Sequence, residues 1–519
     1  MLLCVIFAIM HSVIGAKILV FSPMPVYSHQ QPIAALTKGL LARGHNVTLL
    51  TTNPIKIKSE NFTEYDASSM YSLRSNPRLN QFYQEKVLGV FHLAVITSDM
   101  LIEFYKLATI TAFESSVIQN FVKIIYNETY DVVISETMVA GPFLALGHIT
   151  NAPTVSISTL SFWNLHGYPM GNPTIPTYMP NVLLPYSDHM NFIERIKNLY
   201  VSNYLIFLYN WKLLPLHEFY LRKYFGAEIP SVREMESRQS LQLICTSEIL
   251  SYPVPKVPGI VHVGALHIET PKPLEADLKM WMENAKDGVI YFSLGSNFKA
   301  TSLPANAQET FINAFARFPN TRFIWKWESD KYFPGQPPNV KFIKWVPQQD
   351  LLAHPNIRGF ITQGGIQSLQ EAVMYSVPII GMPMYIDQGF NVHKIVSVGA
   401  GVLLDLTEVT AETVYNSLNK IINEKSYKEN MMKLSNLVKD EPQKPMEKAI
   451  WWIEYVIRNK GTPFRNSSLD LYWYQYLMLD ILCFFVCILV LIGLVIYKII
   501  KTIKDLVFTK VKRRKLKAK

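Results

Sequence analysis

Residues 345–391 read WVPQQDLLAHPNIRGFITQGGIQSLQEAVMYSVPIIGMPMYIDQGFN, and this stretch decides the fold. The short apolar run at 357–362 suits a buried parallel strand, and the residues from 366 to 375 have helical apolar spacing. Gly364 and Gly365 break the pattern between them and predict a tight turn. A glycine turn before a helix N-terminus presents free backbone N–H groups and the positive end of the helix dipole, which suit a phosphate. For this spacing taken alone, a purely structural turn is the alternative.

Polar and aromatic side chains around this turn have the chemistry of nucleotide-sugar contacts. Trp345 follows a predicted strand and offers a flat ring for a base. Ser368 falls in the first helical turn, where its hydroxyl can join the anion site, and Glu371 can accept from a ribose diol. Asp387 and Gln388 follow the next strand and could hold sugar hydroxyls. These positions together favour a nucleotide-diphosphate site over a bare turn.

The patterns W-x-P-Q-x-x-L-L-x-H-P, G-G-x-x-S-x-x-E and P-x-x-x-D-Q resemble the signature of the UDP-glycosyltransferases, in particular the membrane-bound, invertebrate-like animal members. The resemblance covers nearly the whole chain, and a signature of this length is highly specific. It implies an α/β fold of two doubly wound Rossmann-like domains that face each other across a cleft, the glycosyltransferase B-type architecture. It also implies that Trp345 stacks on uracil with Gln348 beside it, that Ser296, His354, Ser368 and the amides after Gly364 and Gly365 contact the diphosphate, that Glu371 binds the ribose, and that Asp387, Gln388 and Asn391 bind the sugar.

One position of the signature departs from the family pattern. Many members carry His where this chain has Gln363. A glutamine side chain can still donate a hydrogen bond to the diphosphate, but it never carries a charge.

The loop at 23–30 after the first predicted strand contains His29, and histidine suits a general base near neutral pH. Taken alone, a loop histidine is more often solvated. The resemblance implies that His29 is the catalytic base, because family members carry theirs at this place. Its usual partner there is Asp, and here the matching position is Glu136 at the end of the strand 131–135. The longer carboxylate can still orient the imidazole, with an adjusted geometry.

The mechanism that the resemblance implies is a single inverting displacement, in which an acceptor hydroxyl attacks the sugar of a UDP-sugar. Glucose is the expected sugar, with glucuronate as the alternative. We expect no metal and no other cofactor, because the chain has no Asp-x-Asp pair of the kind that holds a divalent ion at a diphosphate. The aromatic-rich stretch 190–225 predicts an acceptor pocket for a small, lipophilic acceptor, as in detoxification or conjugation. The alternative is that these aromatic residues form core.

Both ends of the chain carry targeting patterns. Residues 1–16 are apolar with small residues near the end and favour a secretory signal over a buried strand. Residues 481–497 contain no charge, and the stretch to 500 is long enough to span a bilayer. Residues 498–519 have ten Lys or Arg against one Asp, which predicts a cytosolic tail and a lumenal catalytic part. Lysines at 515 and 517 resemble an endoplasmic-reticulum retrieval signal, although a merely basic stop-transfer tail is the alternative.

The distribution of charge and cysteine limits the function classes. The tail carries nine of the ten net positive charges, so the rest is nearly neutral and nucleic-acid binding is not expected. Only Cys245 would reach the lumen, so an intramolecular lumenal disulfide is not expected. We expect glycosylation at Asn61, Asn127 and Asn466, but not at Asn46, which begins a predicted strand.

The chain order predicts a signal peptide and two α/β domains before the membrane segment. Helix predominates in the prediction for 65–126, and a helix is expected at 448–460 that crosses back to brace the first domain. The predicted divisions are 1–16 (signal peptide), 17–250 (acceptor domain), 251–280 (linker), 281–440 (UDP-sugar domain), 441–476 (bracing helix and juxtamembrane segment), 477–500 (transmembrane helix) and 501–519 (basic tail).

Two other readings stay open at the level of sequence. A catalytically silent binding or carrier protein of the endoplasmic-reticulum membrane is motivated by Gln363 and Glu136. A structural membrane protein that binds no nucleotide is the other. Oligomeric state, homo- or hetero-, is not determined by these patterns.

Overall fold

The computed structural model describes residues 15–76, 90–138, 140–329 and 335–517. The chain forms two compact units, residues 1–465 and residues 466–519, and each is considered by itself. The predicted signal segment 1–16 lies almost wholly outside the described residues.

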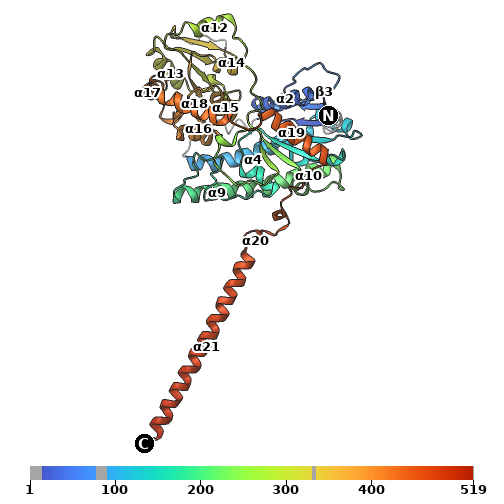
Figure 1. Ribbon diagram of the computed structural model, residues 1–519, viewed down its shortest axis with the longest axis vertical. Coiled ribbons are helices and arrows are strands. Elements are labelled where there is room, and N and C mark those ends of the chain that lie inside the picture. Colours follow the sequence, from blue (N-terminus) through green and yellow to red (C-terminus); the bar gives the residue numbers. More distant parts are fainter. Residues whose placement is uncertain (1–14, 77–89, 139, 330–334, 518–519) are drawn as a thin grey trace, which may run out of the picture. The chain divides into compact units, whose positions relative to one another are not determined.

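The first sheet of the larger unit has seven parallel strands (Figure 1). Alternate residues of one inner strand, β1 (Lys17–Ser22), pack against helices on opposite faces, Ile18 and Val20 on one side and Leu19 and Phe21 on the other. Burial of both faces explains why this strand reads as an unbroken apolar run. The order across the sheet is β3 (Phe62–Asp66), β2 (Asn46–Thr51), β1 (Lys17–Ser22), β4 (Val132–Glu136), β5 (Thr154–Ser158), β6 (Leu241–Ile244) and β7 (Ile260–His262).

Helices cover both faces of this sheet. They are α2 (Tyr27–Ala42), α4 (Val90–Glu114), α5 (Ser116–Ile125), α6 (Ala140–Phe143), α7 (Ala145–Ile149), α8 (Asn164–Gly167), α9 (Phe192–Leu208), α10 (Leu214–Phe225) and α11 (Val232–Ser237), with the short helices η1 (Ser68–Ser75), η2 (Tyr168–Met170), the π-helical turn η3 (Tyr209–Leu213) and η4 (Glu248–Leu250).

The second sheet has six parallel strands and the same doubly wound form. Its central strand is fully buried, with Val289 and Tyr291 in one core and Ile290 and Phe292 in the other. The order is β10 (Val340–Ile343), β9 (Arg322–Lys326), β8 (Val289–Ser293), β11 (Ile357–Thr362), β12 (Ile379–Gly381) and β13 (Gly401–Leu403). The helices that follow or cover these strands are α12 (Ala276–Glu283), η5 (Ala300–Ser302), α13 (Ala305–Ala316), α14 (Gln348–Leu352), α15 (Ile366–Met374), α16 (Gln388–Ser397), η6 (Leu406–Glu408), α17 (Ala411–Asn423) and α18 (Lys425–Lys439).

The winding of each sheet reverses at one place, between β1 and β4 in the first and between β8 and β11 in the second. In open parallel sheets, ligands bind beyond the carboxyl ends of the strands at such a reversal. The predicted fold class, two Rossmann-like sheets with helices on both faces, is confirmed. The reversal also identifies where a site is expected on each sheet.

Three local expectations need correction. The segment 251–280 is more than a linker, because it contributes β7 to the first sheet and contains the start of α12. The stretch 65–126 begins with the last residues of β3, before η1 and the helices. Helix α2 starts at Tyr27 despite Pro32 in its interior, so His29 belongs to a helix and not to a loop. With those corrections, the finer domain boundaries stay a prediction.

A final helix of the larger unit, α19 (Pro445–Asn459), lies beside α2 (Figure 1). Its Ile450 and Ile453 enter the apolar core formed by β1, β4 and α2. Near its end, Glu454 accepts a hydrogen bond from Arg43 at 3.0 Å. A helix at the predicted place therefore packs on the first domain.

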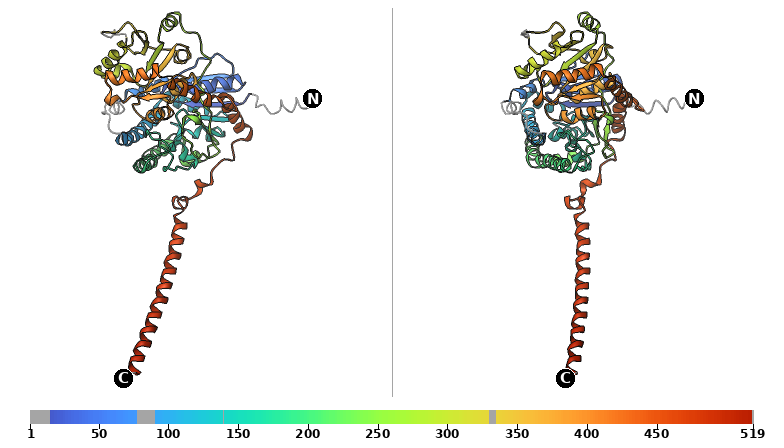
Figure 2. Two further views of the ribbon diagram at one scale, coloured as in Figure 1. Left: turned by 60° about the vertical axis from the view of Figure 1, so that its left-hand side comes forward. Right: turned by 90° about the vertical axis from the view of Figure 1, so that its left-hand side faces the viewer.

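The smaller unit contains η7 (Ser467–Asp470), α20 (Trp473–Tyr476) and α21 (Leu479–Lys517). Figure 2 shows α21 as one continuous helix. Residues Leu479–Arg513 are long and apolar enough to cross a bilayer, and the apolar window is not buried within the protein. The predicted span 477–500 begins two residues before α21 and otherwise falls within the first part of that helix.

Candidate active site

The two predicted catalytic side chains meet at the reversal point of the first sheet. Glu136 is the last residue of β4, and His29 lies in the first turn of the helix that follows β1. The Nδ1 atom of His29 is 3.1 Å from Oε1 of Glu136, and both side chains are almost completely buried. A carboxylate that accepts from Nδ1–H fixes the imidazole tautomer and leaves Nε2 able to take a proton. The pair therefore has the arrangement of an oriented general base.

A second buried carboxylate, Asp387, comes from the side of the second sheet. Asp387 precedes α16, and burial raises the pKa of Asp387, while the hydrogen bond from Asn391 and the charge of His29 oppose this rise. Asn391 donates to Oδ2 of Asp387 at 2.8 Å and to the carbonyl of Gly364 at 3.1 Å. Ser161 of the first domain donates to Asn391 at 3.3 Å. These bonds hold the predicted sugar-contact residues at the meeting of the two sheets.

The predicted glycine turn joins β11 to α15. Gly364 adopts φ +88°, and a Cβ atom there would stand 2.4 Å from Val392, so this turn requires glycine. Gly365 is the N-cap of α15 and provides no side chain to cap the helix. The first-turn amides of α15 are therefore open to an anion.

A pocket of about 390 Å³ lies in front of this turn, and both sheets contribute to its wall. Tyr27, Ser28, Gln31 and Lys38 line it from α2. The opposite wall contains seven of the predicted donor-site residues, namely Ser296, Trp345, Gln348, Gln363, Gly365, Ser368 and Glu371.

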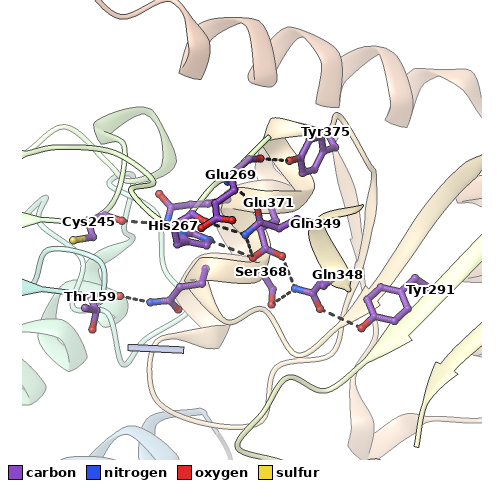
Figure 3. Close-up of polar contacts among 12 residues, drawn as sticks. Thr159, Cys245, His267, Glu269, Tyr291, Gln348, Gln349, Ser368, Glu371 and Tyr375 are labelled. Carbon is purple, nitrogen blue, oxygen red and sulfur yellow. Dashed lines mark hydrogen bonds and ion pairs between the residues drawn. The ribbon is translucent and has the colours of Figure 1, made fainter. Parts of the chain in front are cut away.

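Glu371 is the centre of a hydrogen-bond network in this wall (Figure 3). Gln348 donates to Oε2 of Glu371 at 2.6 Å and to Ser368 at 2.9 Å. On the other side, Nε2 of His267 is 3.3 Å from Oε1 of Glu371, and Gln349 donates to the same oxygen at 3.4 Å. The carboxylate is thus held in one orientation, with lone pairs left for a ligand diol.

Gln363 occupies the position where the family pattern has histidine. Its Nε2 atom packs against the backbone of Gly295, where a Cβ atom would stand only 2.5 Å away. Its Oε1 atom is buried and has no hydrogen-bond partner. A buried amide with an unused polar atom at the pocket wall is suited to a polar ligand.

Five predicted contacts do not line the pocket, namely His354, Gly364, Asp387, Gln388 and Asn391. His354 precedes β11, at the amino end of the strand, whereas the glycine turn follows its carboxyl end. There the Nδ1 atom of His354 accepts from the amide of Asn356 at 3.2 Å, so the predicted diphosphate contact is wrong. Gln388 accepts from the amide of Met384 at 2.9 Å and holds the loop before α16. It does not line the pocket, and neither Asp387 nor Asn391 does.

Several pocket residues were not anticipated from the sequence. Lys326, at the end of β9, lies 5.5 Å from the ring centroid of Trp345 and donates to the carbonyl of Gly295 at 2.9 Å. Tyr27 meets Trp345 edge to face at 5.2 Å, so the exposed indole already has one aromatic neighbour. A lysine at the carboxyl end of a mostly buried strand was the available signal for Lys326. His267 lies in a Pro-rich segment that contains no motif, so the sequence gave no signal for it.

A smaller cavity of about 50 Å³ lies in the first domain next to the His29–Glu136 pair, since Thr137 and Met138 line it. Polar atoms of buried residues in its lining have no partner, including Tyr105 Oη, His217 Nδ1, Glu236 Oε2 and Gln242 Oε1. A cavity of this size admits a few waters or a small polar group.

The hydrogen bonds and burial of His217 and Glu236 determine which atoms in this smaller cavity carry protons. Thr109 donates to the carbonyl of Tyr105 at 2.9 Å, so it accepts from Nε2 of His217 at 3.1 Å. Burial lowers the pKa of His217 to about 3, so Nδ1 is an unprotonated acceptor. Burial raises the pKa of Glu236 to about 7, although the hydrogen bond from Tyr209 and the charge of Arg233 lower it in part. The cavity is rich in acceptors and needs a ligand or waters with donors.

The predicted sequons differ in exposure. Asn61 and Asn127 are exposed, and Asn466 is partly buried. Asn46 is also exposed, so its place at the start of β2 does not bury it. Across the described ranges, no group of three or more His, Cys, Asp or Glu residues gathers as a metal site.

Comparisons with known proteins agree over nearly the whole chain. Residues 16–514 match the sequence model of the family described as UDP-glucoronosyl and UDP-glucosyl transferase. The chain is 34% identical to UDP-glycosyltransferase UGT5 of Dactylopius coccus, over 92% of this chain and 90% of that protein. It is 34% identical to UDP-glucosyltransferase 2 of the same insect, over 91% and 90%. With UDP-glucuronosyltransferase 1-2 of Rattus norvegicus the identity is 31%, over 93% and 90%.

Solved structures share the fold at low sequence identity. The glycotransferase of kitacinnamycin matches with a TM-score of 0.56 and 17% identity, over 85% of this chain and 99% of that one. Glycosyltransferase VinC in complex with DTDP also matches with a TM-score of 0.56, at 14% identity, over 85% and 100%.

Proposed function

This chain belongs to the UDP-glucuronosyl and UDP-glucosyl transferase family and transfers a sugar from a UDP-sugar, and we propose that the sugar is glucose. We further propose that His29 is the catalytic base. The transfer goes to a hydroxyl of a small acceptor with inversion at the anomeric carbon. The observation that carries the proposal is the buried His29–Glu136 pair at the reversal point of the first sheet.

In the proposed reaction, the acceptor oxygen attacks the anomeric carbon while its proton passes to Nε2 of His29. The bond from the anomeric carbon to the diphosphate oxygen breaks, and UDP leaves with the electron pair. Glu136 stabilises the imidazolium through its contact with Nδ1 and stays ionised. Because the acceptor attacks opposite the leaving group in a single displacement, the configuration inverts.

The leaving diphosphate is assigned to the open first turn of α15. Negative charge grows on it in the transition state, and backbone amides at a helix N-terminus are already oriented toward such charge. Ser296, Ser368 and the amide of Gln363 line the same pocket and can add donors. Trp345 offers its exposed ring to uracil, and Glu371 is held ready for the ribose by Gln348 and His267.

A neutral sugar fits the residues assigned to it better than an acidic one. The sugar end is assigned to Asp387 and Asn391, and a glucuronate carboxylate near Asp387 would add like-charge repulsion. Glucose hydroxyls, by contrast, can donate to the Asp387 carboxylate. The Dactylopius coccus relative that is named a glucosyltransferase agrees with this choice.

The acceptor is assigned to the side of the first domain that bears His29. The small cavity beside Glu136 suggests that a polar end of the acceptor enters it, while the apolar body stays outside. A lipophilic acceptor that carries an additional hydrogen-bond donor, as plant and drug phenols do, would satisfy its acceptor atoms. The silent-carrier alternative loses one of its two motives, because Glu136 keeps the contact that an aspartate would make.

The chain is further proposed to be a single-pass protein of the endoplasmic reticulum, with the catalytic part in the lumen. The span candidate within α21 and the basic tail after it support this orientation. Loss of mass on endoglycosidase treatment of Asn61 and Asn127 would confirm it, and unmodified sequons would contradict it.

Mass spectrometry of the product from a mixed pool of UDP-sugars and a flavonoid tests the reaction and the sugar together. We expect a mass increase that corresponds to one hexose. A hexuronic-acid adduct would refute glucose as the donor sugar, and no adduct with any acceptor would refute the proposed activity.

A further inference from the structure

Large apolar side chains remain exposed along α9 and the start of α10. Trp211 has 74% of its surface exposed, Phe192 65% and Phe207 53%. The helix is nevertheless well ordered at its start, where Asn191 and Glu194 form a capping box. The other exposed members of this group are Ile193, Ile196, Leu199, Tyr200 and Phe219.

These residues form one continuous stripe. Positions 192, 196, 199, 203, 207 and 211 recur at intervals of three or four, which is one face of a helix. The opposite face, with Val201, Leu205 and Leu208, is buried in the core shared with α4. The stripe extends over about 30 Å of helix, at about 1.5 Å per residue. The helix therefore has two apolar faces, and only one of them is buried within this unit.

The stripe contains no charged residue, and basic residues flank it. Its polar member is Asn203, while Arg195 and Lys212 lie at its edges, and Lys212 is paired with Asp99 at 3.0 Å. Lys223 of α10 stands 5.9 Å from the ring of exposed Phe219. A face of aromatic and aliphatic residues between cationic side chains is the composition of helices that lie in a membrane interface. It differs from a face that awaits more protein core, where flanking cations would be buried.

Figure 1 shows α9 along the outer edge of the larger unit, beyond α4. Residues 466–478 connect that unit to α21. Thirteen residues reach at most about 45 Å, so a bilayer that holds α21 is always within range of the unit. Such a tether raises the effective concentration of lipid at the stripe and so favours its insertion.

We propose that the apolar stripe of α9 and Phe219 of α10 insert into the headgroup region of an anionic bilayer, which gives this protein a second membrane contact besides α21. The occupant is lipid, because the stripe is uncharged and aromatic and its edges are cationic. The inference rests on the proposed span only for the tether and is independent of the sugar-transfer proposal.

The test uses the full chain in vesicles of phosphatidylcholine with roughly one-fifth phosphatidylserine. A site for a sequence-specific protease is inserted after Leu471, an exposed residue. After cleavage, the vesicles are sedimented and the two fragments are followed separately. The test variant combines Phe192→Ser, Ile196→Ser, Phe207→Ser and Trp211→Ser. The matched control removes four exposed apolar residues elsewhere, through Met280→Ser, Val398→Ser, Met432→Ser and Leu437→Ser.

We expect the catalytic fragment of wild type and control to sediment with the vesicles after cleavage. In the test variant, the soluble fraction should rise by at least about tenfold, since several large side chains lose their insertion. UDP binding, measured on the same preparations, verifies that each variant is folded. Equal release of all three catalytic fragments would overturn the proposal. Retention of the test variant, with its cross-linking into dimers lost, would also overturn it and would assign the stripe to a second copy.

Discussion

The Nδ1 atom of His29 and the Oε1 atom of Glu136 lie 3.1 Å apart although 107 positions separate them in the chain. Neighbouring parallel strands bring them together, because β1 pairs directly with β4 and both residues follow the carboxyl ends. A glutamate in place of the family's usual aspartate therefore still reaches the imidazole. The site tolerates the longer side chain because Glu136 is placed at the last position of its strand.

The first prediction concerns the charge of Glu136. Glu136→Gln should lower kcat by about 10²–10⁴, because an amide cannot stabilise the imidazolium and can select the wrong tautomer. UDP affinity should stay within about twofold, since Glu136 does not line the donor pocket. Steady-state kinetics and UDP titration measure both quantities.

Glu309→Gln provides the control, as an exposed glutamate on α13 that undergoes the same chemical change. Full activity of Glu136→Gln would show that the carboxylate does not act in the reaction.

The second prediction concerns the position of Gln363. Gln363→His should make UDP binding tighten as pH falls through about 6.5, by up to about tenfold, because a protonated imidazole attracts the diphosphate. Wild type provides the reference curve, which also contains the titration of the phosphate itself. Isothermal titration across this pH range measures the difference. Identical curves would mean that residue 363 does not face the diphosphate.

The third prediction couples Gly295 to Gln363. Gly295 has φ +78°, and an added Cβ would stand 2.5 Å from Nε2 of Gln363. Gly295→Ala should lower the free energy of unfolding by about 1–3 kcal/mol. Part of this loss comes from the clash and should disappear when Gln363→Ala is added, so a double-mutant cycle should give a non-additive term. Strict additivity would mean that only the backbone conformation matters.

The fourth prediction concerns the buried carboxyl of Glu236. Its pKa is raised to about 7 by burial, so the folded state holds a proton more tightly than the unfolded state does. The contribution of this group to stability is therefore fully present below about pH 4.5 and is lost as pH rises through about 7, a loss of about 3 kcal/mol. Glu236→Gln cannot ionise and should remove this loss, so its melting temperature should exceed that of wild type at pH 8.

Glu234→Gln is the matched control, two residues away on α11, where Glu234 forms an exposed ion pair with Arg238. The proposed acceptor end supplies a second readout for Glu236→Gln, because the preference for acceptors with an additional hydroxyl should weaken. A melting curve with the same pH dependence as wild type would contradict the burial of an ionisable group here.

The central strands and the glycine turn could be predicted from sequence because burial on both faces leaves continuous apolar runs. The edge strands of the first sheet could not, because Phe62–Asp66 is only partly buried and Ile260–His262 is too short to show a period. The start of α2 was missed because Pro32 normally argues against a helix interior.

Among the site residues, the motif identified which side chains can bind a nucleotide-sugar, but not at which edge of the sheet each one lies. His354 belongs to the same signature as Ser368, yet β11 separates them by about 20 Å of strand, at about 3.3 Å per residue. A motif that spans a whole strand therefore places residues at both edges of the sheet. His267 carried no pattern, since its contact with Glu371 depends on the path of a segment that has no regular period.

The account's central claim is that His29 takes the acceptor proton while UDP binds separately at α15. The most direct measurement is single-turnover transfer by His29→Ala, with UDP affinity determined on the same protein. We predict a loss of about 10²–10⁴ in the rate of transfer, with UDP affinity unchanged. Transfer at the wild-type rate by His29→Ala would contradict the claim.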